Sequence, residues 1–333
     1  MNGKENVLAA LSFRQPLDYV PVWELEFQAW DNLSGKEIYL GQKFCNLSEK
    51  EKDSAIHSNA EIIIETCIDL HFSALTTINN YWEVAPGHPS YSWLPDDWRS
   101  KQNVLLRQLC EKEGIAIAGT SGGCITMPGD SNFNGDNYIE FCCRLIEEPE
   151  CIDEWAENVY KGGVENARKL RDMGYDIAIT CSDIADNKGP FFSPAQMDRW
   201  FFPYLQKWTQ EVEEMGMYTV LHTDGDVTPL LDGLMESRLH GLQAIDSLAG
   251  MDIEHVKKIT AGKLCLCGNT PTGLLVKGPP ECVFESTRDL LQSCKDGGGL
   301  IFGTSNAVVD ETPAENYRQM IEAWKVYGQY DIV

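Results

Sequence analysis

The chain has 333 residues, 43% of them hydrophobic, so it can bury a sizeable core and is not a disordered polymer. Its 51 acidic and 27 basic residues give a formal net charge of −24, which argues against nucleic acid or an anionic membrane surface as a partner. No run approaches the roughly 18 to 20 apolar residues of a membrane span.

The cysteines and the N-terminal residues indicate in which cellular compartment the protein is expected. The chain has 12 cysteines, but several lie inside apolar, regular segments, unlike a disulfide framework. The first residues lack the apolar core and cleavage site of a signal peptide. We therefore expect a reduced, cytoplasmic, soluble protein, of a kind that suits an anaerobe.

Apolar segments with the period of strands alternate with segments that have the period of helices. A short helix is expected at residues 6–13, before the first strand. Strands are expected at 19–25, 72–78, 115–120, 176–180, 218–221, 241–245, 263–267 and 299–303. Helices are expected between them, among them 48–70, 99–112 and 194–215, the last with Ser193 as its cap. Polar or aromatic loops fill 79–98 and 128–137.

Eight strands separated by helices predict parallel β/α units that close into a barrel. The fold class is therefore α/β, a (β/α)8 TIM barrel. We expect one domain over residues 1–333, with an N-terminal helical extension and loop insertions. The rival architecture, a doubly wound open sheet, has fewer strands and often a glycine-rich phosphate loop after the first. Here the first strand continues into VWELEF (22–27), which has no glycine.

Polar side chains stand where the predicted strands end, and a β/α barrel gathers its active site there. His222 and Asp224 are two residues apart, so they share a strand face. Asp183 and Asp246 follow two further strands. Each also has a purely structural interpretation, as a hydrogen-bonded histidine, a helix cap or a loop carboxylate. Glu24, in the same position at the first strand, is a proton donor, a metal ligand or a solvated acid.

Cysteines and aromatic residues add weaker signals. Cys265 and Cys267 share a strand face; Cys265 is expected in the core, and Cys267 lies closer to the strand end, before Asn269. Many aromatic rings follow the first two strands. They either pack on one another, stack on a flat apolar substrate, or form a cage for a quaternary ammonium group. These residues are Trp23, Phe27, Trp30, Tyr81, Trp82, Tyr91, Trp93 and Trp98.

Five segments together resemble the uroporphyrinogen decarboxylase superfamily, and more closely its corrinoid-dependent methyltransferase branch. They are residues 11–27, 182–208, 222–258, 263–283 and 297–324, and they occur in the expected order. The resemblance implies a β/α barrel with its cleft at the carboxyl ends of the strands. This agrees with the strand count, which was obtained without it.

The resemblance does not extend to the decarboxylase's own substrate. That enzyme follows its first strand with arginines that hold the carboxylates of a tetrapyrrole. Here the corresponding residues are Trp23, Glu24, Leu25, Glu26 and Phe27. These acids would repel the carboxylates of a tetrapyrrole, and each close pair of an acid and a substrate carboxylate would cost on the order of 1 kcal/mol or more at partial burial. Uroporphyrinogen is therefore not the expected substrate.

The methyltransferase branch implies a zinc site, but this chain differs from the branch in two of the ligand positions. Its members bind zinc through His-x-Cys after the fifth strand and a Cys near the end of the last. Here those positions are His222, Asp224 and Ser305. Zinc accepts a histidine nitrogen and a carboxylate oxygen, but a neutral serine is a poor ligand. The thiolate site of the thiol-methylating members is therefore absent. The predicted ligands are His222, Asp224 and Cys267, with Cys181, Asp183 or Glu24 as alternatives.

The function implied by the resemblance is methyl transfer from an O-methyl donor, an aryl methyl ether, to the cobalt of a corrinoid. The chain has no cobalamin-binding motif of its own, so the corrinoid is expected on a partner protein. The predicted catalytic residues are His222, Asp224, Glu24 and Asp183. The predicted substrate-binding residues are Trp23, Glu26, Phe27, Asp246, Asn269 and Ser305.

Other functions stay open at this point. One is decarboxylation of a small acid, which would release carbon dioxide without a corrinoid. Another is methyl transfer from an N-methyl or quaternary amine donor. A third is a non-catalytic binding barrel, which the ring of carboxylates disfavours.

Overall fold

A computed structural model describes residues 2–16, 18–77, 80–81, 91–92, 94–126, 138–260 and 262–330. By its internal contacts the chain divides into two compact units. Unit 1 comprises Met1–Gly119 and Cys265–Val333, and unit 2 comprises Thr120–Leu264. In both units, parallel strands alternate with helices, and each unit also contains a two-stranded antiparallel sheet. The prediction of one domain over residues 1–333 stays a prediction.

Unit 1 combines the two ends of the chain. Its N-terminal elements are α1 (Gly3–Leu11), α2 (Trp30–Ser34), α3 (Gly41–Cys45), α4 (Glu49–Asp69), β1 (Ala74–Thr76), β2 (Asn80–Tyr81), β3 (Tyr91–Ser92), α5 (Asp96–Glu113) and most of β4 (Ala116–Thr120). Its C-terminal elements are β10 (Cys265–Cys267), α12 (Thr272–Lys277), α13 (Pro280–Cys294), β11 (Leu300–Ile301) and α14 (Ala314–Tyr327). β1 pairs with β4, and β10 with β11, both in parallel.

The predicted first strand, 19–25, is reduced to isolated bridges. Val22 forms parallel bridges to Phe72 on one side and Phe302 on the other. It therefore joins the ends of the two strand pairs of unit 1. Pro21 has no N–H to donate, which limits regular pairing here. The register of this segment is instead fixed by reciprocal bonds between Trp23 N–H and the Phe302 carbonyl, and between Phe302 N–H and the Pro21 carbonyl.

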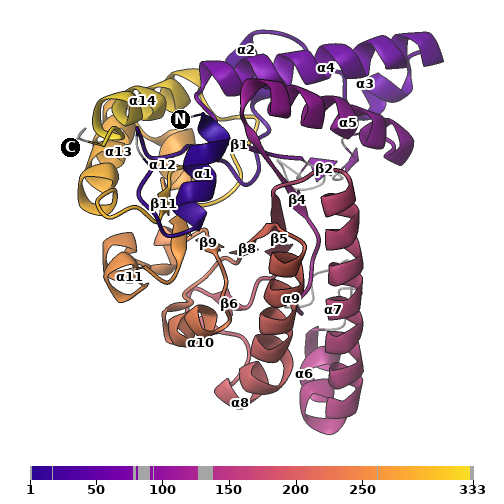
Figure 1. Ribbon diagram of the computed structural model, residues 1–333, viewed down its shortest axis with the longest axis vertical. Coiled ribbons are helices and arrows are strands. Elements are labelled where there is room, and N and C mark those ends of the chain that lie inside the picture. The colour runs from indigo at the N-terminus through magenta and orange to yellow at the C-terminus, as the bar shows by residue number, and fades with distance from the viewer. Residues whose placement is uncertain are drawn as a thin grey trace. The chain divides into compact units, whose positions relative to one another are not determined.

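Two helices of unit 1, α1 and α4, begin at a capping box. Ser48 and Glu51 form a capping box that starts α4. α4 buries an apolar stripe that includes Ile56, Ile63 and Cys67, and it packs on α5. Figure 1 shows α4 and α5 lying side by side. α13 and α14 form a second packed pair.

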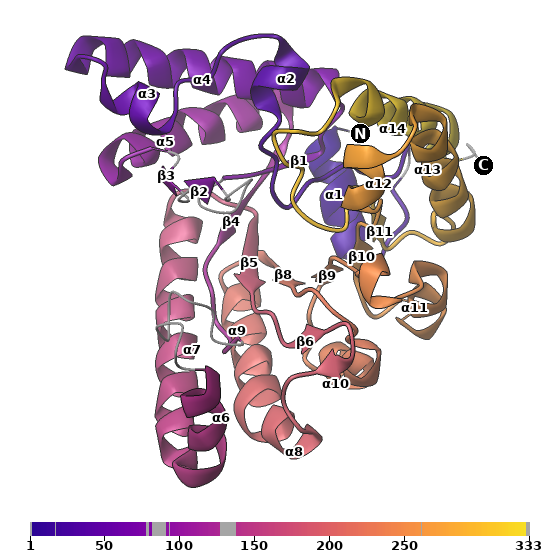
Figure 2. The ribbon, with the colours of Figure 1, turned by 180° about the vertical axis from the view of Figure 1, so that it is seen from behind.

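Unit 2 is a run of elements continuous in sequence. They are α6 (Tyr138–Glu147), α7 (Pro149–Asp172), β5 (Ile177–Cys181), β6 (Ala185–Asp186), β7 (Gly189–Pro190), α8 (Pro194–Gln196), the π-helical segment η1 (Met197–Phe201), α9 (Phe202–Glu214), β8 (Tyr218–His222), η2 (Thr228–Leu230), α10 (Leu231–Glu236), β9 (Gly241–Gln243), η3 (Ser247–Ala249) and α11 (Ile253–Thr260). α7 and α9 pack together and lie side by side in Figure 2.

The strands of unit 2 place their ends in one row. β5, β8 and β9 are parallel neighbours, with Cys181 paired to His222 and His222 paired to Gln243. Side chains that follow these three strands therefore emerge at one edge of the sheet. This is the arrangement that the sequence predicts for its polar strand ends.

The helix predicted at 194–215 is interrupted. Ser193 caps its start as expected, since its side chain accepts a hydrogen bond from Gln196 N–H. The helix then passes through the π-helical turn η1 before α9 begins. Pro203 explains the break, because a proline inside a helix has no N–H for the bond to residue i−4.

Seven of the eight predicted strands are present in order as parallel strands among the described residues. This is the α/β alternation of the TIM-barrel class. No helix among those residues combines the length and apolarity needed to cross a membrane.

Candidate functional site

Three polar side chains meet at the strand ends of unit 2. Asp183, His222 and Asp224 each offer a ligand atom, and these atoms all lie within 4.8 Å of one another. His222 Nε2 is 4.0 Å from Asp224 Oδ1. We call these three residues the Asp–His–Asp cluster. The sequence predicted all three as catalytic, and the structure brings them together.

Three successive backbone N–H groups, of residues 224–226, hold the loop that follows β8. The first donates to Asp183 Oδ1 at 3.0 Å, and the second donates to Asp246 Oδ2 at 3.3 Å. The third donates to the carbonyl of Asp186 at 2.9 Å, in the β6–β7 hairpin. A single stretch of backbone thus ties the loops after β5, β8 and β9 to one another.

Gly225 is required at the centre of this loop. Its φ is +87°, which favours glycine. A Cβ at this position would lie 2.5 Å from the backbone carbon of Ala185. The loop can approach the hairpin so closely only because residue 225 has no side chain.

Gln243 orients the His222 ring. His222 Nδ1 lies 2.5 Å from Oε1 of Gln243, a side chain that is only 2% exposed. With Nδ1–H donating to this amide oxygen, the lone pair of the ring is on Nε2, on the side of Asp224. The His222 side chain is 12% exposed and the Asp224 side chain 38% exposed. The His222 ring is therefore held by the buried Gln243, while Asp224 is accessible to solvent.

When the His222 ring is neutral, the atoms that converge in the cluster are all hydrogen-bond acceptors. Two carboxylates and a neutral imidazole nitrogen repel one another unless a proton or a cation lies between them. Zinc and other divalent metals take nitrogen and oxygen ligands of this kind. The donor set and the second bond of the histidine ring both fit a metal site. His222 and Asp224 belong to the predicted ligand set, and Asp183 is one of its alternatives.

Asp246 has both of its carboxylate oxygens engaged. Oδ1 accepts from Leu248 N–H at 2.8 Å and so caps η3, while Oδ2 accepts from Gly225 N–H. The two residues before it, Ala244 and Ile245, have positive φ values of 101° and 49°. Non-glycine residues held there store of the order of 1–3 kcal/mol each. Through its bond to Gly225 N–H, Asp246 holds the loop that carries Asp224. Its role toward substrate stays a prediction.

The strand ends of unit 1 carry a different kind of site around Glu24. Glu24 Oε2 accepts from Thr304 N–H at 2.9 Å and from Thr304 Oγ1 at 2.6 Å, and Oε1 accepts from Tyr317 Oη at 2.8 Å. Glu24 is 3% exposed. Burial raises the pKa of Glu24 to about 7, against the opposing effect of these hydrogen bonds. We call Glu24, Thr304 and Tyr317 the Glu24 network.

Other predicted residues of unit 1 are buried. Ser305 N–H donates to the Thr270 carbonyl at 2.9 Å, and Ser305 and Asn269 are 3% and 6% exposed. Burial, together with the neighbouring Cys265, raises the pKa of the Cys267 thiol well above its usual value. Cys267 is thus a neutral thiol in unit 1, whereas His222 and Asp224 lie in unit 2. Its metal role stays a prediction.

Among the described residues of the predicted aromatic set, Trp23, Phe27 and Trp30 are buried, and Trp98 is half-buried against Phe44. Trp23 and Phe27 are each 2% exposed. Trp23 Nε1 donates to Thr76 Oγ1 at 2.9 Å, and the Phe27 ring lies edge-to-face on Tyr317 with centroids 5.3 Å apart. Glu26 is partly exposed and accepts from the Gln28 amide at 2.6 Å. Trp82, Trp93 and the side chains of Tyr81 and Tyr91 lie outside the described residues.

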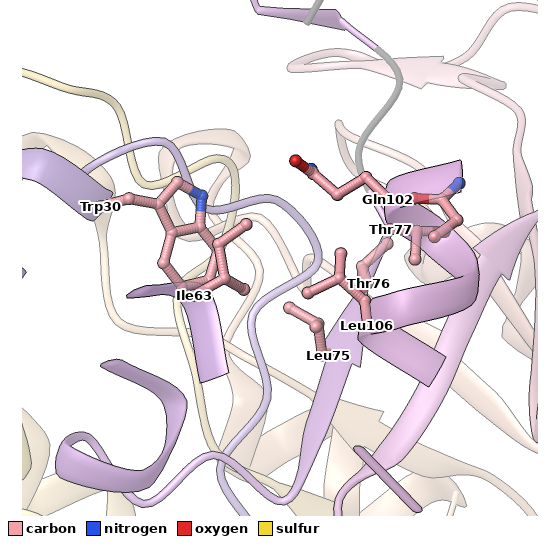
Figure 3. Close-up of a pocket in the computed structure, with 8 residues that line it drawn as sticks. Trp30, Ile63, Leu75, Thr76, Thr77, Gln102 and Leu106 are labelled. Carbon is pink, nitrogen blue, oxygen red and sulfur yellow. The ribbon is translucent and has the colours of Figure 1, made fainter. Parts of the chain in front are cut away.

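A small cavity in unit 1 lies beside the end of β1 (Figure 3). It is lined by Trp30, Ile63, Leu75, Thr76, Thr77, Gln102, Asn103 and Leu106. Trp30 Nε1 and Gln102 Oε1 are buried there and have no hydrogen-bond partner among the described residues. The space is about large enough for one water molecule.

Several residues that position these sites were not predicted. Gln243 carried a signal, since an amide inside an apolar strand must find a partner when it is buried. Gly225 lies in a loop whose close approach to Ala185 depends on contacts distant in sequence. Tyr317 lies on α14, 293 residues after Glu24, and no local pattern connects the two.

Comparisons with known proteins agree with this description. The family model described as Uroporphyrinogen decarboxylase (URO-D) matches residues 105–327. The match covers more than half of the chain. The chain belongs to the uroporphyrinogen decarboxylase family, as its sequence pattern predicted.

Two methanogen proteins are similar to this chain. Each is named methylcobamide:CoM methyltransferase MtbA, one from Methanosarcina acetivorans (26% identical) and one from Methanosarcina mazei (27% identical), over 227 residues in each case. The matched part is 67% of this chain and 62% of the relatives' length. A solved methyltransferase structure from Methanosarcina mazei shares the fold, with a TM-score of 0.68 and 17% identity over 98% of this chain and 99% of that one.

Proposed function

We propose that this member of the uroporphyrinogen decarboxylase family is a corrinoid-dependent methyltransferase. It moves a methyl group from an O-methyl donor, an aryl methyl ether, to the cobalt of a corrinoid carried by a partner protein. The similarity to methylcobamide:CoM methyltransferases supports a corrinoid as one reaction partner. The observation that carries the proposal is the Asp–His–Asp cluster, which contains no thiolate.

The ligand type favours oxygen over sulfur as the atom that exchanges the methyl group. Soft thiolate ligands accompany soft metal chemistry, whereas carboxylate and imidazole ligands favour harder partners such as an ether oxygen. Asp224 stands where thiol-methylating members have cysteine, and Ser305 stands at the second cysteine position. A site of this kind is better suited to activating a methoxy group than to binding a thiol acceptor.

The residues of the cluster have separable tasks in such a reaction. When cobalt attacks the methyl carbon in line, negative charge develops on the phenolate oxygen that leaves. A divalent metal bound at the cluster would supply Lewis acidity at that oxygen, an effect of several kcal/mol. Asp183, His222 and Asp224 would hold it, and Gln243 keeps the Nε2 lone pair of His222 directed at it.

The test is methyl transfer with defined components. Purified protein, a methoxyarene and a corrinoid protein reduced to cobalt(I) are mixed, and methylcobalt formation is followed by its visible absorption. We expect methylation and release of the phenol with the wild type, and loss of both with His222→Ala. Methylation of a thiol from methylcobalamin, with no reaction of the methoxyarene, would refute the O-methyl assignment.

Two alternatives are separated by the same components. A decarboxylase of the type named by the family would release carbon dioxide from a small acid without any corrinoid. An N-methyl or quaternary amine methyltransferase would methylate cobalt from an amine but not from a methoxyarene. A cage for such an ammonium group needs open ring faces, and Trp23, Phe27 and Trp30 are all buried.

A further inference from the structure

The hydroxyl of Thr304 lies between two acceptors in the Glu24 network. It is 2.6 Å from Glu24 Oε2 and 2.5 Å from the carbonyl oxygen of Asn306. A threonine hydroxyl has one proton to donate. It can therefore satisfy only one of these two oxygens, and the other contact would bring lone pairs together at hydrogen-bond distance.

A proton on Glu24 removes the conflict. A neutral Glu24 donates through Oε2 to Thr304 Oγ1, and Thr304 then donates to Asn306. Oε1 still accepts from the Tyr317 hydroxyl, and Oε2 keeps a lone pair for Thr304 N–H. Every short contact around the carboxyl group is then a hydrogen bond with one donor and one acceptor.

The surroundings of Glu24 favour the same state. The ionisation of Glu24 is affected by its burial and, among the described residues, by Thr304 and Tyr317. Neither residue brings a positive charge. Tyr317 is buried, and its own pKa is raised well above the usual value by burial and by Glu24, with Cys67 of α4 as a further neighbour. Nothing in this set compensates a buried carboxylate in the way that a lysine or arginine would.

We propose that Glu24 carries a proton in the folded protein, and that this proton, passed through the Thr304 hydroxyl, holds the turn of residues 304–306 in place. Thr304 and Tyr317 are then positioning residues. Loss of the proton turns the Thr304 hydroxyl toward Glu24 and withdraws it from the Asn306 carbonyl. Ser305, a predicted substrate-binding residue, lies in the middle of this turn.

Gly303 makes the arrangement possible. A Cβ on Gly303 would lie 2.1 Å from the Trp23 carbonyl and 3.1 Å from Glu24 Oε2. The end of β11 can therefore lie directly against the backbone that carries Glu24. The turn of residues 304–306 and the carboxyl group are in contact because of this close backbone approach.

Infrared spectroscopy tests the proton directly. A neutral carboxylic acid has a C=O stretching band that a carboxylate lacks. We expect this band in the wild-type protein at pH 6, with loss around pH 7 as Glu24 ionises. It should be absent in Glu24→Gln and unchanged in Glu315→Gln, which alters an exposed glutamate on the same helix as Tyr317.

Two further variants test the hydroxyl groups. Tyr317→Phe removes a donor that stabilises the carboxylate, so the midpoint of the band should move to higher pH. Thr304→Val removes the hydroxyl that accepts the Glu24 proton, together with its conflict with the Asn306 carbonyl, so the midpoint should move to lower pH. Thr304→Ser, which keeps the hydroxyl, should restore the wild-type midpoint. Absence of the band in the wild type at pH 6, or a midpoint that neither variant moves, would overturn the proposal.

The consequence for substrate rests on the proposed function and has its own readout. In the methyl-transfer assay, Thr304→Val should lose turnover and Thr304→Ser should recover it. The infrared band decides the state of Glu24 even if no methoxyarene is demethylated. Failure of the proposed function and failure of this inference therefore give different results.

Discussion

Carboxyl groups at the strand ends of the two units lie in opposite surroundings. In unit 2, Asp183 and Asp224 lie beside a histidine nitrogen, with the Asp224 side chain 38% exposed, and a cation would satisfy all three groups. In unit 1, Glu24 is 3% exposed, surrounded by hydroxyl and aromatic groups, and holds its own proton. The position in the fold is equivalent, but the solvation is not.

The comparison shows that a strand-end acid does not have a fixed chemical role. Exposure keeps a carboxylate ionised and available to a metal, while burial without a positive neighbour makes the neutral acid the stable form. The first state suits Lewis-acid chemistry, and the second suits the fixing of a loop. Four predictions test this difference, from the largest expected effect to the smallest.

Loss of the histidine should strongly weaken metal binding in unit 2. When the metal-free protein is titrated with zinc in a calorimeter, we expect binding in the wild type. His222→Ala should weaken it more than roughly a hundredfold, because loss of an outer partner alone costs about 10- to 100-fold. Asp183→Asn and Asp224→Asn should also weaken it.

Asp226→Asn is the matched control for the metal titration. Asp226 lies in the same loop, but its Oδ1 accepts from Thr228 N–H, a bond that asparagine can keep. Zinc affinity should therefore be unchanged. Equal loss in this variant would mean that the acidity of the loop, rather than the cluster, binds the metal.

The buried acid of unit 1 should make the protein less stable at higher pH. The folded-state pKa of Glu24 is about 7, above its ordinary value of 4.5. The neutral form therefore stabilises the fold fully below pH 4.5, and this contribution is lost as the pH rises through 7. The difference amounts to at most about 3 kcal/mol.

Chemical denaturation at pH 5 and pH 8 measures this effect. The free energy of unfolding should fall between the two pH values in the wild type, and Glu24→Gln should reduce the fall. The infrared titration assigns the change to this residue. If Glu24→Gln retains the full pH dependence, Glu24 is not its origin.

Gly225→Ala should disrupt the loop that holds the Asp–His–Asp cluster. An added Cβ would lie 2.5 Å from the Ala185 backbone, and residue 225 has a φ of +87°, which an alanine rarely adopts. We expect a loss of about 2 to 3 kcal/mol of unfolding free energy, together with loss of zinc binding. Denaturation and calorimetry measure both.

Gly250→Ala separates the close contact from the backbone conformation. Gly250 has a φ of +84°, and a Cβ there meets nothing within 4 Å among the described residues. It should cost only about 1 kcal/mol and leave zinc affinity intact. A cost equal to that of Gly225→Ala would remove the argument from the contact with Ala185.

The smallest predicted effect concerns the orientation of the histidine ring. Gln243→Leu removes the acceptor from His222 Nδ1, and zinc affinity should fall by about 10- to 100-fold. Gln243→Glu keeps an acceptor and should retain most of the affinity. If Gln243→Leu binds zinc as well as the wild type does, Gln243 does not orient the ring.

Much of the fold could be predicted from the sequence because its signals are local. Apolar periodicity marks the strands and helices, and residues such as Ser48 and Ser193 mark helix starts through bonds to groups three residues away. The break inside residues 194–215 was missed, although Pro203 carries its cause. The first predicted strand is reduced to isolated bridges at Tyr19 and Val22, because regular pairing depends on both neighbours and not on the segment itself.

The candidate site likewise has features that local patterns predict and features that depend on contacts distant in sequence. Alternating strand geometry was enough to place His222 and Asp224 together, and the order of parallel strands was enough to bring Asp183 to the same edge. Which acid is ionised could not be predicted in this way. It depends on burial and on partners up to 293 residues distant, such as Tyr317 for Glu24.

By itself, the sequence determined the family, the strand–helix order and the residues that carry ionisable groups at the strand ends, because these follow from short-range patterns. Only the tertiary structure decided that Gln243 orients His222, that Gly225 and Gly303 permit close backbone contacts, and that Glu24 is enclosed by Thr304 and Tyr317. Solvation and hydrogen-bond geometry depend on the packed fold, and they set the chemical state of each acid.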